Sequence, residues 1–531
     1  MSGRAPSEVM PFGDVLVRAA RRWPESVAVA FPEQRLTTVE LLGEAYRVAR
    51  GLHALGIRRG ERVGIVAPNC VEYHAALFGG ALLGVEVVTV NARFRATELA
   101  YVFDDASLAA VLTSDVLGDE VDFVGLLRGA IPHAPSVRHA VMLGASSPEG
   151  FVDRAELDRL AETVDDATVD EAADRVRVRD VAIMMYTSGT TAQPKGCPLT
   201  HEAIVRTSQA MVTRFGLTDA DVWWDPLPMF HLSSILPLTC ALLVGSPFAT
   251  MVDFEPGAAL AQVERERVTF LWSTFPTITQ ELVGHPSFPS TDTSTIRLVN
   301  QVAPPDLQRG LQRALPGAVQ VSAYGCTELG GIVAMNDPAE DAESRATTCG
   351  PPFAGVELRI VDPETGAEVA RGEPGEITGR GPGLFEGYHN SPERNAEAID
   401  ADGFFHTGDI GCVDAAGRLS YLGRTKDMLK VGGENVACLE IESFLATHPA
   451  VRLAQVVGIP DARLVEVPAA FVQLEPGQTA TEEELIAFFK GQVASFRIPR
   501  HVRFVDDWPM SATKVQKFRL REQLVAELGL E

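Results

Sequence analysis

The sequence has few cysteines, and none of the seven is spaced as a pair. They are scattered and odd in number, and no C-x-x-C motif occurs, which argues against both a disulfide framework and a zinc site. A reducing compartment suits such a chain, and we expect the cytoplasm. The seven positions are Cys70, Cys197, Cys240, Cys326, Cys349, Cys412 and Cys438.

Basic residues are also scarce, since 46 lysines and arginines stand against 71 aspartates and glutamates, and the net charge is −25. Broad nucleic-acid binding and binding to anionic membranes both need basic surfaces, so this balance argues against both classes. A ligand that contains phosphate would therefore have to find positive charge close to its own site.

Long apolar runs are missing as well. The two most apolar stretches, residues 75–85 and 236–244, are too short to span a bilayer and are typical of core helices. The N-terminus lacks the continuous apolar core of a signal peptide, and its apolar residues follow helical spacing. We therefore expect no transmembrane segment, and an N-terminal amphipathic helix that presents Phe12, Val15, Leu16, Ala19 and Trp23.

What the sequence does contain is a regular alternation of strand-like and helix-like segments. Its 531 residues exceed what one hydrophobic core usually organises, so we expect two or more domains. Short β-branched runs alternate with helical stretches over residues 27–110 and again after residue 181, which is the rhythm of a parallel sheet. Residues 350–423 are rich in turns and short strands, and residues 426–531 indicate a compact α+β domain.

The predicted fold class is therefore α/β. We expect a large N-terminal domain of doubly wound sheets over residues 1–425, with a small β-rich subdomain at 350–423, followed by a small α+β C-terminal domain at 426–531. Five predicted strands, which end near residues 186, 224, 272, 299 and 323, lead into loops that carry Gly, Thr, His, Tyr and Glu. Ligands of open α/β sheets bind at the carboxyl ends of the strands, so these loops are expected to share one rim.

A loop rich in hydroxyl residues and glycine, Thr-Ser-Gly-Thr-Thr-Ala-Gln-Pro-Lys-Gly at residues 187–196, follows the first of these strands. Backbone N–H groups, hydroxyls and one lysine can surround phosphate oxygens. The loop does not match the pattern of P-loop nucleotide enzymes, because a proline precedes Lys195 and Gly196 stands where the magnesium-binding Ser or Thr would be. A flexible surface loop is the alternative that composition alone would favour.

Further motifs follow along the chain: Tyr-Gly-Cys-Thr-Glu at 324–328, Gly-Glu-Ile at 375–377, Phe-His-Thr-Gly-Asp at 405–409, Gly-Arg-Thr-Lys-Asp at 423–427, Gly-Gly-Glu-Asn at 432–435, and Lys514. With the loop at 187–196 they resemble the adenylate-forming superfamily, in its acyl-CoA synthetase branch, over nearly the whole chain. The resemblance implies that a carboxylate attacks the α-phosphate of ATP to give an acyl-adenylate and pyrophosphate. The thiol of coenzyme A then displaces AMP, and the small C-terminal domain moves between the two steps.

The resemblance also implies roles for individual residues, and their chemistry suits those roles. Adenylation joins two anions, so its site must neutralise charge on the α-phosphate and on the leaving pyrophosphate. Lys195 is expected at the pyrophosphate, Thr327 at the α-phosphate, and Glu328 as the ligand of magnesium. Lys514 is expected to approach the reacting carboxylate in the adenylation step. The residues expected to bind the nucleotide are Thr187, Ser188, Gly189, Thr190, Thr191, Ala303, Tyr324, Gly325, Asp409 and Arg424.

For two of the residues expected to bind the nucleotide, the part of ATP that each would contact can be named. Tyr324 offers a flat ring that could stack on adenine, with simple packing of a loop tyrosine as the alternative. Asp409 can accept hydrogen bonds from both ribose hydroxyls.

The acyl group and the pantetheine chain are expected beside a third set of residues: His231, Trp272, Cys326, Lys430, Gly432 and Gly433, with Lys426 at the hinge. Relatives that activate amino acids place an aspartate where this chain has His231, so an acid without an α-amino group is favoured. The loops expected to line the pocket hold Trp224 and residues 231–235, 272–275, 301–303 and 326–333, with no obligate charge. The expected substrate is therefore a medium- or long-chain fatty, alicyclic or aromatic acid.

Two departures from the family pattern leave alternatives open. Ala192 stands where relatives usually carry glycine, and the usual glycine before Lys514 is missing, which makes Lys517 a second candidate for the adenylation lysine. The main prediction is an ATP-dependent carboxylate–CoA ligase that uses Mg²⁺, coenzyme A and a small-molecule acid, without a nucleic-acid partner. The alternatives are an acyl-AMP ligase that loads a carrier protein, an amino-acid adenylating enzyme, and a catalytically weak homologue that binds nucleotide or acyl ligands. A homodimer is left open.

Overall fold

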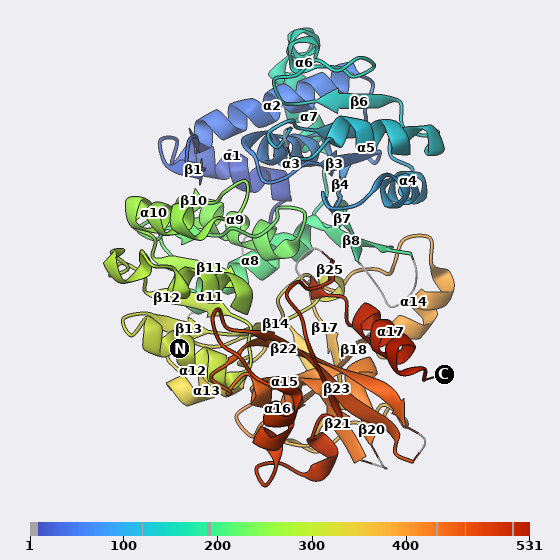
Figure 1. The fold of residues 1–531 in the computed structure, drawn as a ribbon. Coiled ribbons are helices and arrows are strands. Elements are labelled where there is room, and N and C mark those ends of the chain that lie inside the picture. Colours follow the sequence, from blue (N-terminus) through green and yellow to red (C-terminus); the bar gives the residue numbers. More distant parts are fainter. Residues whose placement is uncertain are drawn as a thin grey trace.

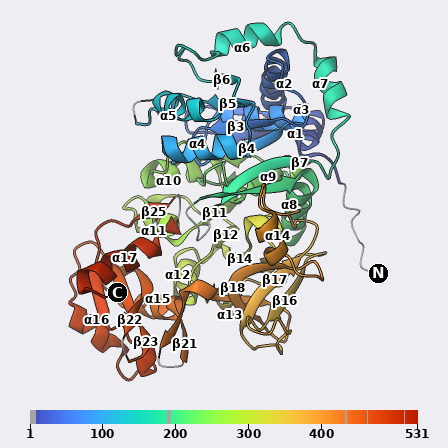
Figure 2. The ribbon, with the colours of Figure 1, turned by 90° about the vertical axis from the view of Figure 1, so that its right-hand side faces the viewer.

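The computed structural model describes residues 9–118, 120–187, 193–431, 434–461, 463–511 and 514–530. Two large sheets with their helices occupy the upper and middle parts of the molecule as drawn, and a β-rich sheet and the C-terminal region lie below them (Figure 1, Figure 2). The predicted fold class is confirmed, because the large N-terminal part is built on mostly parallel sheets and a small mixed region follows it.

The first sheet has six strands in the order β6-β5-β3-β4-β7-β8. Its neighbours are parallel except for β7 and β8, which run antiparallel. The strands are β3 (Arg62–Val66), β4 (Glu86–Thr89), β5 (Ala110–Thr113), β6 (His139–Met142), β7 (Val181–Thr187) and β8 (Lys195–Thr200). The helices that accompany it are α2 (Thr38–Ala54), α3 (Val71–Leu83), α4 (Ala96–Asp105), α5 (Phe123–Ala130), η1 (Ile131–His133), α6 (Arg154–Ala161) and α7 (Asp166–Ala173).

The second sheet has seven strands in the order β13-β12-β11-β9-β10-β1-β2, and only the β1–β2 pair is antiparallel. The strands are β1 (Val27–Ala30), β2 (Arg35–Thr37), β9 (Trp223–Trp224), β10 (Phe248–Ala249), β11 (Phe270–Thr274), β12 (Leu298–Gln301) and β13 (Val319–Val321). The accompanying helices are α1 (Phe12–Arg22), α8 (His201–Phe215), α9 (Leu232–Val244), α10 (Pro256–Glu266), α11 (Pro276–Gly284), η2 (Phe288–Ser290), α12 (Pro305–Ala314) and α13 (Ala342–Thr347).

The predicted common rim is formed by four of the five expected strands. β9, β11, β12 and β13 are consecutive neighbours in the seven-stranded sheet, whereas β7 belongs to the six-stranded sheet, so the expectation is wrong for β7. The physical reason is that parallel strands are joined by long crossovers, and a local pattern does not show which sheet a strand will enter. The loop after β7 therefore approaches the other four from a different sheet.

Helix formation follows the predicted patterns. The N-terminal amphipathic helix is confirmed as α1, which buries Phe12, Val15, Leu16 and Ala19, while Trp23 follows its last turn. The two most apolar stretches are confirmed as parts of α3 and α9, which are buried nearly all round. Such all-round burial explains why neither helix has a polar face.

Smaller antiparallel sheets follow the second large sheet. A two-stranded ladder joins β14 (Ala323–Tyr324) to β15 (Ala334–Met335), with the short helix η3 (Thr327–Leu329) between them. A four-stranded sheet has the order β16-β17-β18-β19. Its elements are β16 (Glu357–Val361), β17 (Gly375–Arg380), α14 (Pro392–Ala398), β18 (Phe405–Val413) and β19 (Leu419–Arg424).

In its described residues, the C-terminal region combines one mixed sheet with three α-helices and two short 3-10 helices. The sheet joins β21, β20, β23 and β22, with β24 parallel to β23, and β25 and β26 form a separate hairpin. The strands are β20 (Met428–Val431), β21 (Glu434–Ala437), β22 (Val451–Asp461), β23 (Val465–Leu474), β24 (His501–Phe504), β25 (Met510–Ser511) and β26 (Lys514–Val515). The helices are η4 (Thr425–Asp427), α15 (Cys438–Leu445), α16 (Glu482–Phe489), η5 (Ser495–Arg497) and α17 (Lys517–Leu528).

The hydrophobic clusters divide the chain in the same way. The largest cluster runs through both large sheets and into the four-stranded sheet, and the C-terminal region has two clusters of its own. A region with its own core can fold as a domain, which supports the predicted division near residue 425. The boundary itself stays a prediction. Within the described residues, no helix has the length and apolar character needed to cross a membrane.

Candidate active site

The base of the predicted phosphate loop is fixed in the structure. Thr187 at the end of β7 pairs with Lys195 at the start of β8. The carbonyl of Gly196 accepts a hydrogen bond from the His389 N–H at 2.8 Å, and a Cβ atom on Gly196 would meet the Cβ of His389 at 3.0 Å. The tip of the loop lies outside the described residues, and with it the predicted contacts of Ser188, Gly189, Thr190 and Thr191.

Lys195 and Glu328, predicted from separate motifs, meet at one tyrosine. The hydroxyl of Tyr388 donates a hydrogen bond to Oε1 of Glu328 at 2.8 Å, and Nζ of Lys195 lies 4.9 Å from the centre of the Tyr388 ring. Burial and the nearby charge of Arg394 lower the pKa of Lys195, although the carboxylate of Glu328 works in the opposite direction. Burial, reinforced by the charge of Glu328, raises the pKa of Tyr388, so its hydroxyl keeps its proton.

Tyr388 was missed by the sequence reasoning. It lies in the segment between β17 and α14, and its only sequence signal is a tyrosine that follows Gly387 in a turn-rich stretch. Such a residue is more often simply packed in a loop, so composition gave no reason to select it.

The motif at residues 324–328 is a tight turn that leads into η3. Gly325 leaves no room for a side chain, because a Cβ atom there would lie 1.7 Å from the carbonyl oxygen of Gly331. Thr327 and Glu328 are half-buried on the short helix, and the backbone carbonyl of Glu328 accepts a hydrogen bond from the Phe385 N–H at 2.9 Å. Burial, then the charge of Glu328, raises the pKa of Cys326, so the thiol stays protonated beside the two predicted phosphate ligands.

Three of the residues predicted to bind the nucleotide form one connected group. The hydroxyl of Tyr324 donates a hydrogen bond to Oδ2 of Asp409 at 2.8 Å, and Nε of Arg424 forms an ion pair with Oδ1 of Asp409 at 3.1 Å. The Asp409 side chain is 6% exposed and that of Arg424 is 48% exposed. Burial opposes the charge of Arg424, but the carboxylate of Asp409 holds its pKa above the ordinary value.

The ring of Tyr324 is packed against a second tyrosine. Its centre lies 5.8 Å from that of Tyr421, with an angle of 26° between the two planes, and Tyr324 is buried. The described contacts therefore correspond to the packing alternative, and stacking on adenine stays a prediction. Ala303, the remaining predicted contact, is half-buried in the loop after β12.

An aromatic cluster lies behind the loop that carries His231. Trp272 is 1% exposed, and its ring NH donates a hydrogen bond to the backbone carbonyl of Ser233 at 2.8 Å. The rings of Trp223 and Phe270 pack on it, with centres 5.5 Å and 5.4 Å away. His231 itself is half-buried at the start of α9, with its ring 4.7 Å from that of Phe230.

Trp224 does not join this cluster, although its loop was expected to line the acyl pocket. Its ring NH bonds to Oε1 of Gln262 at 3.0 Å, and the ring packs in the cluster between the second sheet and α10. Successive side chains of a strand point to opposite faces, so Trp223 and Trp224 necessarily separate. Trp223 is the one that faces Trp272.

The loop after β11 carries a strained residue. Thr274 has φ +54°, in the left-handed region that residues with a branched Cβ rarely adopt. Its carbonyl accepts a hydrogen bond from the Val302 N–H at 2.7 Å, and its hydroxyl accepts one from the Asn300 amide at 3.0 Å. These bonds tie the end of β11 to the end of β12, beside Ala303.

The lysines predicted in the C-terminal region are placed by their backbone alone. Lys430 lies on β20, opposite Asn435, and Lys514 pairs with Ser511 in the β25–β26 hairpin. The side chains of Lys426, Lys430 and Lys514 lie outside what the structure describes, as do Gly432 and Gly433.

Lys517, the second candidate for the adenylation lysine, is engaged elsewhere. It begins α17, and its Nζ lies 2.6 Å from Oε1 of Glu442 and 3.7 Å from Oδ2 of Asp427. Burial works against its charge, but the two carboxylates, Glu442 first, hold the pKa of Lys517 above its ordinary range. Glu442 also accepts the Val456 N–H at 2.7 Å, so this ion pair is part of the C-terminal core.

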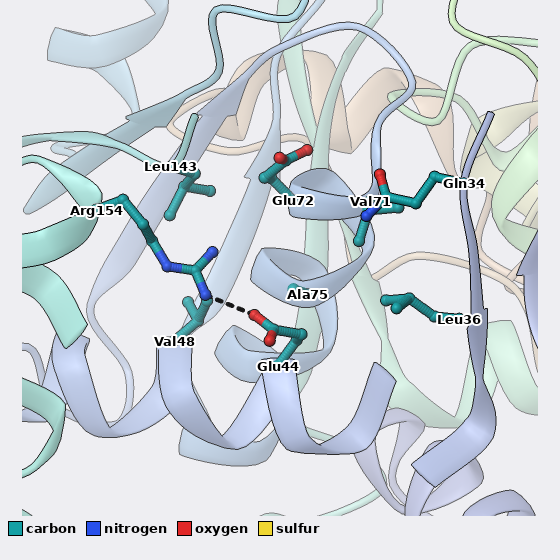
Figure 3. Close-up of a pocket in the computed structure, with 9 residues that line it drawn as sticks. All are labelled: Gln34, Leu36, Glu44, Val48, Val71, Glu72, Ala75, Leu143 and Arg154. Atoms are coloured by element: carbon teal, nitrogen blue, oxygen red, sulfur yellow. Dashed lines mark hydrogen bonds and ion pairs between the residues drawn. The ribbon is translucent and has the colours of Figure 1, made fainter. Parts of the chain in front are cut away.

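A cavity of about 190 Å³ lies away from all of these residues, among α2, α3 and α6. Arg154 points across it toward Glu44, and the two form an ion pair at 2.6 Å (Figure 3). None of the residues predicted for the site lines this cavity.

Two protein-family models match this chain, and known proteins are similar to it over nearly its whole length. Residues 16–389 match the model of the AMP-binding enzymes, and residues 440–514 match that of the AMP-binding enzyme C-terminal domain. A Mycobacterium tuberculosis protein named 3-[(3aS,4S,7aS)-7a-methyl-1,5-dioxo-octahydro-1H-inden-4-yl]propanoyl:CoA ligase is 36% identical over 512 residues, which cover 96% of this chain and 97% of that protein.

Two further proteins are similar to this chain over nearly its whole length. A Bacillus subtilis protein named putative acyl-CoA synthetase YngI is 32% identical over 538 residues, 98% of either chain. A solved structure of the anthranilate CoA ligase AuaEII in complex with anthranoyl-AMP superposes with a TM-score of 0.88 at 26% identity, over 99% of both chains. These similarities extend across both the N-terminal part and the C-terminal region.

Proposed function

Because the chain belongs to the AMP-binding enzymes and is an ATP-dependent acid–CoA ligase that acts through an acyl-AMP, we propose that its acid is hydrophobic. The observation that carries the proposal is the aromatic cluster of Trp223, Phe270 and Trp272 behind the His231 loop. These rings belong to the buried core and give the His231 loop an apolar support, which favours an apolar acyl group beside that loop. A medium- or long-chain fatty, alicyclic or aromatic acid fits, and the M. tuberculosis relative is named for a fused-ring propanoyl substrate.

The ribose of ATP is assigned to Asp409. A carboxylate accepts two hydrogen bonds well, and the position of Asp409 is fixed by Tyr324 on one oxygen and Arg424 on the other. Because Arg424 is half exposed, its guanidinium can shift to a phosphate while Asp409 takes the ribose hydroxyls.

The phosphates are assigned to Lys195, Thr327 and Glu328. The ammonium of Lys195 neutralises the leaving pyrophosphate, and the Thr327 hydroxyl donates to the α-phosphate. Magnesium would be held by Glu328, since Mg²⁺ in nucleotide sites takes one or two carboxylates together with phosphate oxygens and water. One Glu328 oxygen is already oriented by the Tyr388 hydroxyl, which fits this ligand role. When bound, the ion supplies charge neutralisation at the phosphates.

The C-terminal region is assigned a part in both half-reactions. Lys514 approaches the reacting carboxylate for adenylation, and Lys517 is left to the C-terminal core, because its ammonium is already paired with Glu442. Thioester formation is assigned to Lys430, Gly432 and Gly433, and the hinge is assigned to Lys426. We assign the protein to the cytoplasm and leave a homodimer as a possible assembly.

The test is acid-dependent release of pyrophosphate across a panel: octanoate, palmitate, cyclohexanecarboxylate, benzoate and, as the amino-acid control, alanine. With coenzyme A we expect acyl-CoA and AMP in equal amounts from at least one hydrophobic acid and none from alanine. Without coenzyme A we expect enzyme-bound acyl-AMP and little turnover. Activity with alanine alone would overturn the proposed acid class, and acyl transfer to a phosphopantetheine carrier but not to coenzyme A would favour the carrier-loading alternative.

A further inference from the structure

Tyr388 stands between two groups of opposite charge that lie on different elements. Glu328 belongs to η3, Lys195 begins β8, and Tyr388 contacts the first with its hydroxyl and the second with its ring face. A hydrogen bond to a carboxylate and a cation over an aromatic face are both favourable and directional contacts. One side chain thus fixes the direction of both groups.

Tyr388 is itself held in place by its backbone and its ring. The amide of Asn395 accepts the Tyr388 N–H at 2.7 Å and donates to the Tyr388 carbonyl at 2.9 Å. The ring of Phe385 meets that of Tyr388 edge-on, with centres 4.8 Å apart, and Tyr388 is only 9% exposed. Gly387 has φ +123°, and a side chain there would meet Asn395 at 2.7 Å. The ring has little freedom to turn away.

The same segment is bonded to both elements that it serves. The N–H of Phe385 bonds to the carbonyl of Glu328 at 2.9 Å, and the N–H of His389 bonds to the carbonyl of Gly196 at 2.8 Å. Residues 385–389 therefore join η3, which lies between β14 and β15, to the base of the loop between β7 and β8, and these two pairs of strands belong to different sheets. Within the described chain, no ion pair joins Lys195 directly to Glu328.

We propose that Tyr388 is a positioning residue for adenylation, which keeps Glu328 and Lys195 apart and directed at the metal and at the pyrophosphate respectively. This inference rests on the proposed function of the site. Without the tyrosine, the carboxylate and the ammonium would be free to pair with each other, because opposite charges on half-buried side chains attract strongly. Each would then be lost to the ligand that it is assigned to bind.

Two substitutions separate the two contacts. Tyr388→Phe removes the hydroxyl bond to Glu328 and keeps the ring beneath Lys195, whereas Tyr388→Leu removes both. Tyr46→Phe is the matched control, because the hydroxyl of Tyr46 on α2 donates to Asp170 on α7 at 2.5 Å, and neither residue belongs to the proposed site. Loss of a partner that orients a metal ligand typically weakens metal binding by about 10- to 100-fold.

The experiment measures Mn²⁺ affinity in the presence of a non-hydrolysable ATP analogue, from the electron paramagnetic resonance signal of free Mn²⁺. Tyr388→Phe should weaken Mn²⁺ binding about 10-fold or more, whereas Tyr46→Phe should not change it. In kinetics, Tyr388→Phe should raise the Mg²⁺ concentration needed for half-maximal adenylation. It should leave the conversion of preformed acyl-AMP and coenzyme A to acyl-CoA unchanged, because that step releases no pyrophosphate.

The outcomes distinguish this inference from the proposed function. If wild-type protein adenylates acids and Tyr388→Phe binds Mn²⁺ as tightly as wild type, the positioning role is wrong and the function stands. If the variant loses both half-reactions by the same factor, Tyr388 has a general structural role, which also overturns the inference. If wild-type protein adenylates no acid, the proposed function fails, whatever the variant does. Should Tyr388→Leu fail to fold, the isosteric Tyr388→Phe still decides.

Discussion

Replacement of Asp409 by asparagine should weaken the use of ATP without unfolding the protein. Asp409 is the buried centre of a group in which Tyr324 donates to one carboxylate oxygen and Arg424 pairs with the other. Asparagine has nearly the same shape, and its amide oxygen can still accept the Tyr324 hydroxyl. It cannot accept a second strong hydrogen bond, and it carries no charge for Arg424.

The size of the effect follows from these contacts. A hydrogen bond to a charged group contributes about 1.5–3 kcal/mol, so the loss of one ribose bond should reduce kcat/KM for ATP by about 10- to 150-fold. The stability cost should be only about 1 kcal/mol, because Arg424 is half exposed and water can solvate it. Asp409→Ala loses both acceptors and should be more severe for ATP.

The assay is initial-rate kinetics at varied ATP with saturating acid and coenzyme A, alongside thermal unfolding of each variant. Tyr324→Phe serves as the comparison, since it removes the bond that orients Asp409 and leaves both carboxylate oxygens in place. It should reduce kcat/KM for ATP less than Asp409→Asn does. A kcat/KM for Asp409→Asn within twofold of wild type, with unfolding unchanged, would refute the assignment of the ribose to Asp409.

Three further predictions test the surrounding account. Lys517→Met should destabilise the C-terminal region by about 3 kcal/mol, because it leaves Glu442 without its ion pair. Below the melting temperature of that variant, adenylation should continue. Lys514→Ala should abolish acyl-AMP formation and leave the stability of the protein unchanged. Gly325→Ala should lower adenylation by about 100-fold, since its Cβ would collide with a carbonyl oxygen, whereas Gly43→Ala, where a Cβ meets nothing, should leave activity unchanged. Burial lowers the pKa of His201 from 6.5 to about 4. As the pH falls, this histidine therefore binds a proton in the unfolded chain before it does so in the folded protein. The contribution of His201 to stability should therefore be constant above pH 6.5 and fall by up to about 1.4 kcal/mol per pH unit between pH 6.5 and 4. His201→Gln should remove that share of the slope in calorimetry, while His74, whose pKa burial also lowers to about 4, keeps its own share.

The sequence predicted the positions of the strands better than it predicted which strands pair with one another. The strands at 181–187, 223–224, 270–274 and 298–301 were expected at nearly these positions, because short β-branched runs between turn signals are local features. The sheet that β7 enters was not predictable, since its pairing with β4 joins residues about a hundred positions apart. Contacts of this kind are decided by packing of the whole domain.

The same limit applies to single side chains. Asp409, Tyr324 and Arg424 were selected separately, and the structure joins them, but the bonds between them could not be read from spacing. Trp223 and Trp224 are adjacent and chemically identical, so only the strand's orientation decides which faces Trp272. Tyr388 gave no signal, because its importance lies in two partners from distant parts of the chain.

Direct bond formation between the acid and the α-phosphate is the step that the residues assigned to adenylation serve. It is tested most directly with a hydrophobic acid labelled with ¹⁸O in its carboxylate, followed by mass spectrometry of the products after acyl-CoA has formed. We predict that AMP gains one ¹⁸O atom for each acyl-CoA and that pyrophosphate gains none. Unlabelled ADP in place of AMP, together with label in inorganic phosphate, would show activation through an acyl-phosphate and would contradict direct attack on the α-phosphate.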